Sequence, residues 1–361
     1  TDMDADQRRE SVDNVGSRIS PLGLLALGVA YIGLSIAVWQ LADPEFVPAP
    51  WWPAAGLTLG VMCRTRGSQW PAVAATVFVA DIAADLTESA GLLTSLGWAL
   101  ANTVEPLLGA AALRLAFHRR LPSFESVRDF GKFLLVVAVA GAPIASLIGG
   151  ATSAISFDLD FLVSWRDWYI GDVLGILVVA PFVLYFDQLR AILDGRLVAM
   201  LGLTAIASAS IFWLADDELL SQPYLITPLL VAISVYFGAP GAASAGLIVS
   251  TIANVSSALG NGPYAQVETG DDVLLQLQLF TAVQLSAAYV LVGLRAQLLD
   301  ANSQAAFLRQ QRERDPLTGT GSRYLMDKTM DNVMALRNES GGESAAPASI
   351  TESHLLPLDR P

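Results

Sequence analysis

Long apolar runs separated by short polar loops dominate the chain. The hydrocarbon core of a bilayer is about 30 Å thick, so a helix that crosses it needs roughly 20 apolar residues. Runs near this length predict ten membrane-spanning helices, at residues 21–41, 47–63, 70–87, 91–117, 131–155, 168–186, 197–215, 223–237, 240–259 and 273–299. The second and eighth runs are short and contain Pro, which predicts tilted, broken or re-entrant segments. The expected fold class is therefore an all-α polytopic membrane protein.

The distribution of Lys and Arg predicts how these helices are oriented. Basic residues are retained on the cytoplasmic side of short loops. If the amino terminus is inside and all ten segments cross, one side holds Arg8, Arg9, Arg18, Arg64, Arg66, Arg119, Arg120, Arg128, Lys132, Arg190 and Arg196. Only Arg166 falls in a loop on the other side. We therefore expect a multi-pass protein of the inner (cytoplasmic) membrane, with both termini in the cytoplasm.

The predicted outer loops are acidic. They contain Asp158, Asp160, Asp167, Asp216, Asp217, Glu218, Asp271 and Asp272. This acidity has two explanations, attraction of a cationic ligand or the mere absence of Lys and Arg from outer loops. We favour the second, because topology alone requires it.

Composition narrows the function classes. The chain has 53% hydrophobic and 15% charged residues and a formal net charge of −13, whereas soluble domains have about 25% charged residues. Nucleic-acid binding needs clustered Lys and Arg, so no nucleic-acid partner is expected. One Cys and two isolated His residues provide no metal site of the usual kind. We expect neither a metal nor a cofactor in this chain.

Several polar residues interrupt the apolar runs. Such residues are costly in lipid, usually face the bundle interior and often mark function. The candidates are Asp81, Asp85, Asn102, Glu105, Asp172 and Asn254, together with Gln276, Gln278 and Gln284 in the last segment. The spacings between Asp81 and Asp85 and between Asn102 and Glu105 place each pair on one helical face.

The depth of these residues follows from a helical rise of about 1.5 Å per residue. Counted from Gln69, Asp81 lies roughly 18 Å above the cytoplasmic surface, and Asn254, counted from Pro240, about 21 Å above it. Asp172, counted from Trp168, is expected only about 6 Å below the outer surface. Polar groups at mid-depth or in the outer half predict a cavity that opens to the outside.

Two interpretations of these polar groups stay open. They could bind a ligand, or they could join helices through hydrogen bonds worth about 0.6–2 kcal/mol each. The predicted ligand site consists of Asp81, Asp85, Asn102, Glu105, Asp172, Asn254 and Trp52. The pair of Trp51 and Trp52 also fits an interfacial anchor, which is the usual position of Trp in membrane proteins.

Four stretches resemble a known family. They read PWWPAAGLTLGVMCRTRGSQWPAVA, LANTVEPLLGAAALR, WRDWYIGDVLGILVVAPFVL and GNGPY. They resemble the first class of bacterial membrane-associated sensor domains (MASE-type), multi-helix input modules found ahead of cyclases and histidine kinases. The most specific part is the pattern Trp-x-x-Gly-Asp-x-x-Gly-x-x-x-x-Ala-Pro from Trp168 to Pro181. The resemblance covers about residues 20–295 and implies an integral-membrane sensor, although small residues in these motifs also fit close helix packing.

A heptad pattern continues beyond the last apolar run. Its apolar positions are Ala287, Leu291, Leu294, Leu298, Ala301, Ala305 and Leu308. This spacing is typical of a two-stranded coiled coil, and a single amphipathic helix is the alternative. We prefer a parallel homodimer, because a narrow apolar seam is only half buried in a monomer.

The stretch RDPLTGTGSR resembles the start of a GGDEF domain, the diguanylate cyclase fold. Asp315, Leu317, Thr318, Gly319 and Arg323 match its signalling turn, whereas Thr320 and Ser322 depart from it. The family synthesises cyclic di-GMP from GTP with Mg²⁺ held by acidic residues. The sequence after residue 337 has no strand-length apolar segments for that core, so we assign no catalytic residues and expect no cyclase activity. GTP and Mg²⁺ are expected only for a complete output domain.

Together these patterns predict a transmembrane sensory input module of a bacterial signalling protein. The expected organisation is a disordered cytoplasmic tail (1–20), a sensor domain (21–292), a signalling coiled-coil helix (293–314), a truncated GGDEF start (315–337) and a disordered tail (338–361). Expected partners are membrane lipid, a second copy and an unidentified small molecule. The alternatives are a proton- or ion-coupled small-solute transporter and a scaffold that recruits a partner cyclase or kinase. The heptad helix favours the sensor, because a transporter needs no such stalk.

Overall fold

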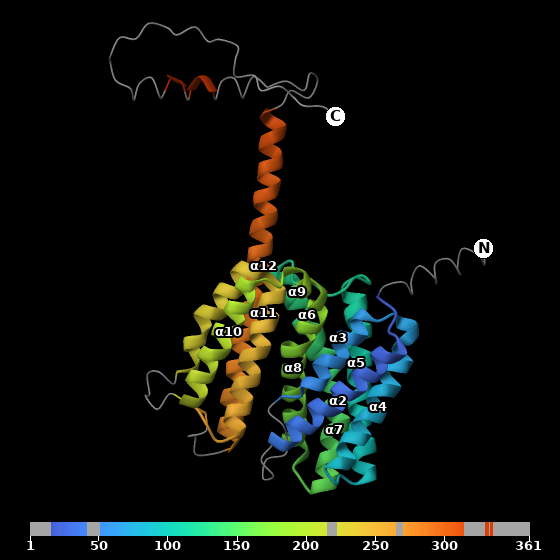
Figure 1. The fold of residues 1–361 in the computed structure, drawn as a ribbon. Helices are drawn as coiled ribbons and strands as arrows, with labels where there is room; N and C mark the ends of the chain where they lie inside the picture. The colour runs from blue at the N-terminus through green and yellow to red at the C-terminus, as the bar shows by residue number, and fades with distance from the viewer. Residues whose placement is uncertain are drawn as a thin grey trace, which may run out of the picture. The chain divides into compact units, whose positions relative to one another are not determined.

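The computed structural model describes residues 16–41, 51–214, 222–264, 270–313, 329–331 and 333–334. In these ranges the chain is almost entirely helical, with one isolated β-bridge between Ser17 and Thr65. The helices are α2 (Pro21–Leu41), α3 (Pro53–Arg64), α4 (Trp70–Thr87), α5 (Leu92–Ala116), α6 (Val127–Val139), α7 (Ala142–Phe157), α8 (Phe161–Leu184), α9 (Phe186–Ile192), α10 (Gly195–Ala209), α11 (Thr227–Ala258) and α12 (Gly270–Glu313) (Figure 1). Short turns of 3-10 helix (Gly67–Gln69 and Pro223–Ile226) and π-helix (Ser210–Leu214) lie between them.

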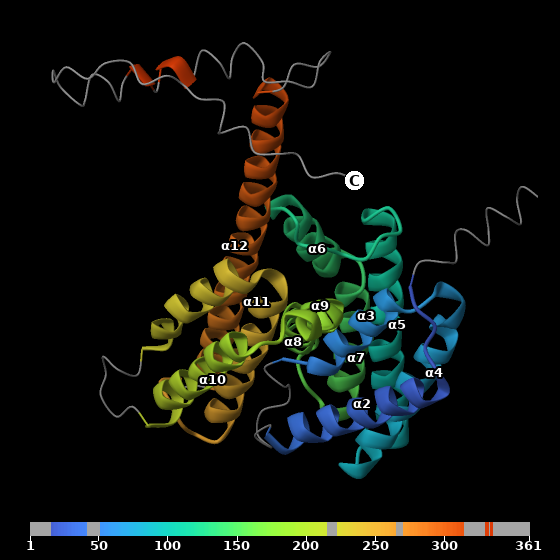
Figure 2. The same cartoon turned by 45° about the horizontal axis from the view of Figure 1, so that its top comes forward.

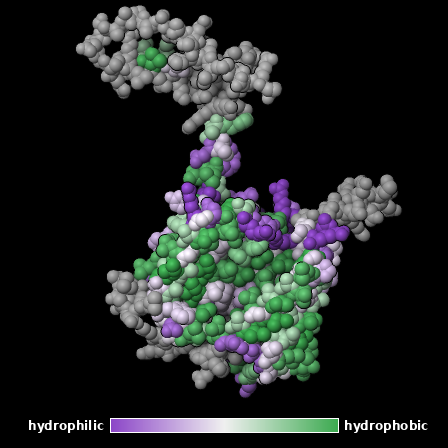
Figure 3. All heavy atoms as spheres, in the orientation of Figure 1, coloured by the Kyte–Doolittle hydropathy of each residue, from purple (hydrophilic) through white to green (hydrophobic). Residues whose placement is uncertain are grey.

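Within the described ranges, seven helical stretches are long and apolar enough to cross a membrane. They are Pro21–Leu41, Gly67–Thr87, Val127–Phe157, Phe161–Leu184, Gly195–Trp213, Pro223–Ala258 and Leu275–Leu308. The chain is therefore a nearly all-helical, multi-pass membrane protein, which confirms the predicted fold class. Hydrophobic side chains cover most of the face of the bundle shown in Figure 3, and hydrophilic ones gather mostly toward its two ends.

The predicted count of ten crossings is approximate. The segment at 47–63 contains α3, which has only 12 residues. The segment at 91–117 forms α5, whose apolar run is interrupted by Asn102 and Glu105. The eighth and ninth segments fall together in one of the seven stretches, Pro223–Ala258.

Helix α11 nevertheless contains two antiparallel halves. Gly238 has a non-helical backbone with φ 66° and ψ −151°. The rings of Tyr224, before α11, and Tyr264, after it, lie 5.9 and 6.0 Å from the ring of Phe280. A straight helix of 32 residues would separate its ends by about 48 Å, so the chain must reverse at Gly238. The eighth and ninth predicted segments are thus the two arms of a helical hairpin.

The helices pack around two apolar cores. The larger core joins α2 to α6 and α8 with parts of α11 and α12, and the smaller joins α10, α11 and α12. Figure 2 shows the same division, with α10 to α12 side by side and α2 to α8 forming the other group. Helix α8 is buried along most of its second half and lies at the centre of the larger core.

The predicted basic loops meet at one end of the bundle, which we call the arginine end. The backbone N–H of Ser17 donates to the carbonyl of Arg64 at 2.8 Å, and Arg64 forms an ion pair with Asp187. Arg114 donates to the carbonyl of Thr65 and lies over the ring of Trp70, 4.3 Å from its centroid. Loops that are far apart in the sequence therefore meet as the predicted alternation of crossings requires.

Helix α12 is continuous for 44 residues. Residues up to Gln297 belong to the helical bundle, and residues from Leu298 onward form a separate unit. The large apolar side chains of Leu294, Leu298 and Leu308 in the heptad pattern are 50, 62 and 57% exposed. None of the residues that the structure describes therefore covers these three side chains of the heptad stripe.

Candidate functional site

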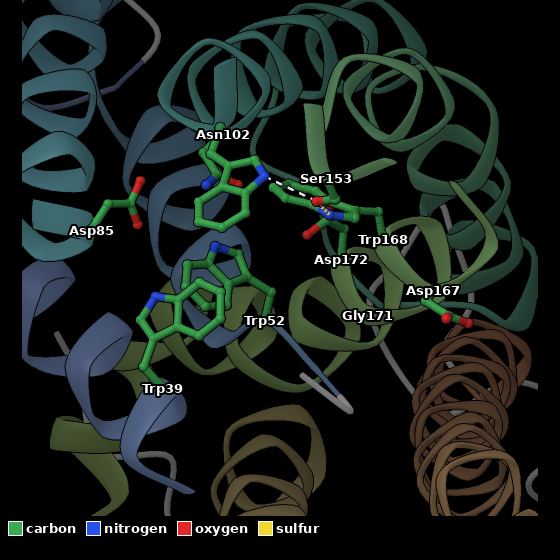
Figure 4. A pocket seen from close by; sticks show the side chains of 10 residues that line it. Trp39, Trp52, Asp85, Asn102, Ser153, Asp167, Trp168, Gly171 and Asp172 are labelled. Atoms are coloured by element: carbon green, nitrogen blue, oxygen red, sulfur yellow. Dashed lines mark hydrogen bonds between the residues drawn. The ribbon is translucent and has the colours of Figure 1, made fainter. Parts of the chain in front are cut away.

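A pocket lies among the helices at the end opposite the arginine end. It is lined by Trp39, Trp52, Asp85, Trp98, Asn102, Ser153, Asp167, Trp168, Gly171 and Asp172, and has a cavity volume of about 50 Å³ (Figure 4). These residues come from α2, the start of α3, α4, α5, α7 and α8. A pocket assembled from so many helices can change shape when the helices shift.

Four indole rings form one side of this pocket, and we call them the tryptophan wall (Trp39, Trp52, Trp98 and Trp168). Trp39 stacks on Trp98 with ring centroids 5.4 Å apart and meets Trp52 edge-on at 6.2 Å. Trp98 and Trp168 are 6.4 Å apart. Both donate their N–H groups to the hydroxyl of Ser153, at 3.0 and 3.1 Å, which fixes the orientation of the two rings.

The backbone contacts of Trp52 explain why its ring lies in the pocket. Trp52 precedes α3, and its N–H donates to the carbonyl of Gly171 on α8 at 2.9 Å. Gly175, one turn further along α8, leaves room for the carbonyl of Trp52, because a Cβ there would lie 1.9 Å from that oxygen. The start of α3 is thus seated directly on the backbone of α8. Trp52 lines the pocket, and Trp51 is only 9% exposed, so the structure does not support an interfacial anchor.

Three acidic or amide side chains offer free oxygen atoms to the pocket. Asp85, Asn102 and Asp172 line it and are 2, 5 and 1% exposed. Asp85 Oδ2, Asn102 Oδ1 and Asp172 Oδ2 are buried without a hydrogen-bond partner. Buried polar atoms are normally paired, and a buried atom without a partner costs about 1–3 kcal/mol. Such atoms are retained where a ligand or water satisfies them.

Asp81 lies behind Asn102 and holds it in place. The amide of Asn102 donates to both carboxylate oxygens of Asp81, at 3.2 and 3.1 Å. The hydroxyl of Tyr31 on α2 donates to Asp81 Oδ1 at 2.8 Å. Asp81 thus holds the amide nitrogen of Asn102, and the carbonyl oxygen of Asn102 is left for the pocket.

Glu105 adds a further carboxylate to this region. It is 1% exposed, and both of its oxygen atoms lack a hydrogen-bond partner. Its carboxyl group lies within interaction range of Asp172, which in turn lies within range of Asp81. Several acidic groups from α4, α5 and α8 are therefore close enough to interact, and burial makes their negative charge expensive.

The structure brings together six of the seven predicted ligand-site residues. Trp52, Asp85, Asn102 and Asp172 line the pocket, and Asp81 and Glu105 interact with them. Asn254 lies elsewhere, in an apolar groove between α2, α3, α8 and α11. Its amide donates to the carbonyl of Ser250 on its own helix.

The helix start from which the depth of Asp172 was counted is wrong. Helix α8 begins at Phe161 and not near Trp168, because Asp160 caps it by accepting from the N–H of Val163. Arg166 and Asp167, which pair with each other at 2.7 Å, lie inside this first part of the helix and interrupted the apolar run. Asp172 is therefore about 16 Å from the start of α8, whereas a start at Trp168 would put it about 6 Å along the helix.

Sequence reasoning missed several pocket residues, chiefly Trp39, Trp98 and Ser153. Their pairing depends on contacts between helices that are far apart in the sequence. The signal available in the sequence was the number of Trp residues in the predicted outer half, each of which also fits an interfacial position.

The predicted signalling turn at Asp315, Leu317, Thr318 and Gly319 lies outside the described residues. No three His, Cys, Asp or Glu side chains in the described parts of the chain are grouped so that they could hold a metal ion.

Comparison with known proteins places the whole bundle in one family. The family model of the MASE1 domain matches residues 22–298. A curated protein of Escherichia coli (strain K12), named "Probable diguanylate cyclase DgcE", is 24% identical over 213 residues, which are 58% of this chain and 19% of that protein. The chain thus spans about a fifth of the length of this relative. No solved structure matches. The family match ends before residue 315, so the resemblance of that turn to a GGDEF start stays a prediction.

Proposed function

Because the chain belongs to the MASE1 family of membrane sensor domains, we propose that its pocket binds a small ligand and that binding changes the state of α12. The change would pass along α12 to a diguanylate cyclase-type output, as the name of the E. coli relative suggests. GTP and Mg²⁺ would belong to that output. The arginine end would face the cytoplasm, as the distribution of basic residues favours.

One observation carries this proposal: buried oxygen atoms without partners line a pocket built from several helices. Asp172 Oδ2 and Asn102 Oδ1 both meet this description. Interactions that only join helices would pair these atoms with each other or with hydroxyl groups. Their unpaired state favours a ligand site over structural hydrogen bonding.

A continuous path of packed side chains supports the relay. Helix α8 carries Asp172 near its middle and is followed at the arginine end by Tyr185. The hydroxyl of Tyr185 accepts from the N–H of Phe124 at 2.6 Å. The ring of Phe124 lies 4.9 Å from that of Tyr289 on α12. A movement of α8 would therefore press on α12 through two aromatic contacts.

The exposed stripe of α12 supports a homodimer. Leu294, Leu298 and Leu308 are half or more exposed, and they share the heptad pattern predicted for a two-stranded coiled coil. A second copy would cover this stripe in parallel. Signals in such an assembly would travel as a shift or twist of the paired helices.

Disulfide crosslinking of α12 tests the relay. Ala301 belongs to the stripe, and we expect Ala301→Cys to form crosslinked dimers in membranes under mild oxidation. Adding Asp172→Asn should change the crosslinking rate by about twofold or more, because the pocket biases a two-state equilibrium of α12. The yield of dimer on non-reducing gels measures both effects.

Two controls accompany this experiment. Ser303→Cys lies about 200° around the helix from residue 301 and should crosslink several-fold less. The unsubstituted chain is the blank, because its single Cys63 is buried. Equal crosslinking at both positions, or no response to Asp172→Asn, would contradict the relay. Solute uptake into proteoliposomes that Asp81→Asn or Asp172→Asn abolishes would instead establish a transporter.

A further inference from the structure

The chemistry of the pocket points to a class of ligand. We propose that it binds a small organic cation with an alkylated ammonium group, held between the tryptophan wall and the carboxylate of Asp172. This inference rests on the proposed function, because it names the ligand class of the same pocket.

The charge of the pocket is the first reason. Three of its ten lining residues are Asp, and none is Lys, Arg or His. Arg166 pairs with Asp167 at 2.7 Å, whereas no ion pair in the described part of the chain involves Asp85 or Asp172. A buried carboxylate without a partner is costly, and a cation in the pocket would offset that cost. The same charge would repel an anionic ligand.

The tryptophan wall is the second reason. A cation over an aromatic face, within about 6 Å of the ring centroid, is attracted by the ring quadrupole, and Trp is the strongest partner. Alkylated ammonium groups suit such walls because they are weakly hydrated. Ca²⁺ and Mg²⁺ instead need shells of oxygen ligands, and the described residues offer no metal-binding group of three or more acidic, His or Cys side chains.

The free polar atoms suit the same ligand. Asp85 Oδ2, Asn102 Oδ1 and Asp172 Oδ2 are acceptors without donors, whereas Ser153 already accepts two indole N–H groups. An ammonium charge or a hydroxyl on the ligand would satisfy these acceptors. Indole donors are present too, since Trp39 Nε1 is buried without an acceptor, and a ligand hydroxyl could accept from it.

The size of the pocket limits the ligand. Its cavity volume of about 50 Å³ is well below the range of roughly 300–1,000 Å³ for small-molecule sites. So small a cavity suits a compact head group and not a long polyamine or a peptide. Choline is therefore a suitable probe.

The test compares choline with 3,3-dimethylbutan-1-ol, in which carbon replaces the charged nitrogen. Both are titrated into the detergent-purified full chain at fixed NaCl concentration, with calorimetry and tryptophan fluorescence as readouts. We expect choline to bind with a Kd of about 1 mM or tighter, and the neutral analogue at least about tenfold more weakly. The pair isolates charge because the two molecules share their shape.

Variants of the pocket complete the test. Asp172→Asn and Trp39→Leu should each weaken choline binding by about tenfold or more. The matched control is Trp213→Leu, since Trp213 is 51% exposed and does not line the pocket. Melting curves without ligand show whether each variant is folded.

Three outcomes would overturn the inference. These are an absence of choline binding, equal binding of the neutral analogue, and pocket variants that bind like the unsubstituted chain. Crosslinking at Ala301→Cys measures the relay separately. A chain that ignores choline but whose crosslinking responds to Asp172→Asn would refute the ammonium ligand and leave the proposed function intact.

Discussion

At the scale of single residues, Asp172 and Gly175 lie on one turn of α8 but have different roles. Asp172 presents a free oxygen to the pocket. Gly175 allows the backbones of α3 and α8 to touch, because a Cβ there would lie 1.9 Å from the carbonyl oxygen of Trp52. Gly56 makes the reciprocal contact, since its Cβ would lie 2.3 Å from the carbonyl oxygen of Gly175. Packing therefore explains the glycine spacing of this motif, and the proposed ligand site would explain the carboxylate next to it.

Gly175→Ala tests the packing role. The added methyl group would clash with backbone atoms, which cannot rotate away, so we expect a loss of about 1–3 kcal/mol of stability. The melting temperature of the detergent-purified protein measures this loss. Gly33→Ala in α2 is the control, because no atom lies within 4 Å of a Cβ at that position and Ala is the better helix former. Equal melting temperatures for the two variants would contradict the close contact of α3 with α8.

At the scale of elements, the sequence predicted helices best where their ends are marked by composition. The runs at 21–41 and 70–87 coincide with α2 and α4, since polar loops bound both. The single helix predicted at 131–155 is in fact two, α6 and α7. The sequence shows no sign of the break between them, because the residues around Gly141 are apolar throughout. There the backbone passes so close to α5 that a Cβ on Gly141 would lie 2.4 Å from the carbonyl oxygen of Glu105. Such a contact between distant segments cannot be read from periodicity.

The hairpin in α11 gives an element-scale prediction. Gly238 combines a positive φ with an extended ψ, a region that is costly for residues with a Cβ. Gly238→Ala should therefore destabilise the bundle by about 1–3 kcal/mol. Differential scanning calorimetry in detergent would detect a lower melting temperature.

The control for this hairpin is Gly202→Ala in α10. A Cβ at Gly202 would meet no atom within 4 Å, so that variant should melt at or slightly above the temperature of the unsubstituted chain. If Gly238→Ala behaves in the same way, the two arms of α11 do not require this turn.

At the scale of the whole bundle, the polar residues of the pocket could be predicted from the sequence, whereas its Trp residues could not. Carboxylate and amide groups such as Asp81, Asn102 and Asp172 could be predicted because lipid makes them expensive wherever they occur. The tryptophan wall could not, because Trp at a helix end is ordinary and only the assembled bundle shows that Trp39 stacks on Trp98. The structure therefore adds an aromatic side to the predicted cluster of polar groups.

The same assembly joins the pocket to α12 through the arginine end. Tyr289 is fully buried on α12, with its ring 4.9 Å from Phe124 and 5.4 Å from Phe130. Phe124 is in turn 5.6 Å from the ring of Tyr185, at the end of the helix that carries Asp172. Each step is a contact between packed rings, so the proposed relay would need no large movement of any one helix.

Tyr289→Leu tests whether this path carries the signal. Leu keeps the site apolar but removes the ring that meets Phe124, so we expect Asp172→Asn no longer to change the crosslinking of Ala301→Cys. The measurement is a double-mutant cycle on the crosslinking rate, in which the pocket and Tyr289 should be strongly non-additive. Tyr289→Phe is the matched control, because the Tyr289 hydroxyl has no hydrogen-bond partner and the ring is retained. If the response to Asp172→Asn persists in Tyr289→Leu at full size, the coupling follows another route, for which the contacts of α11 with α8 are the remaining candidates.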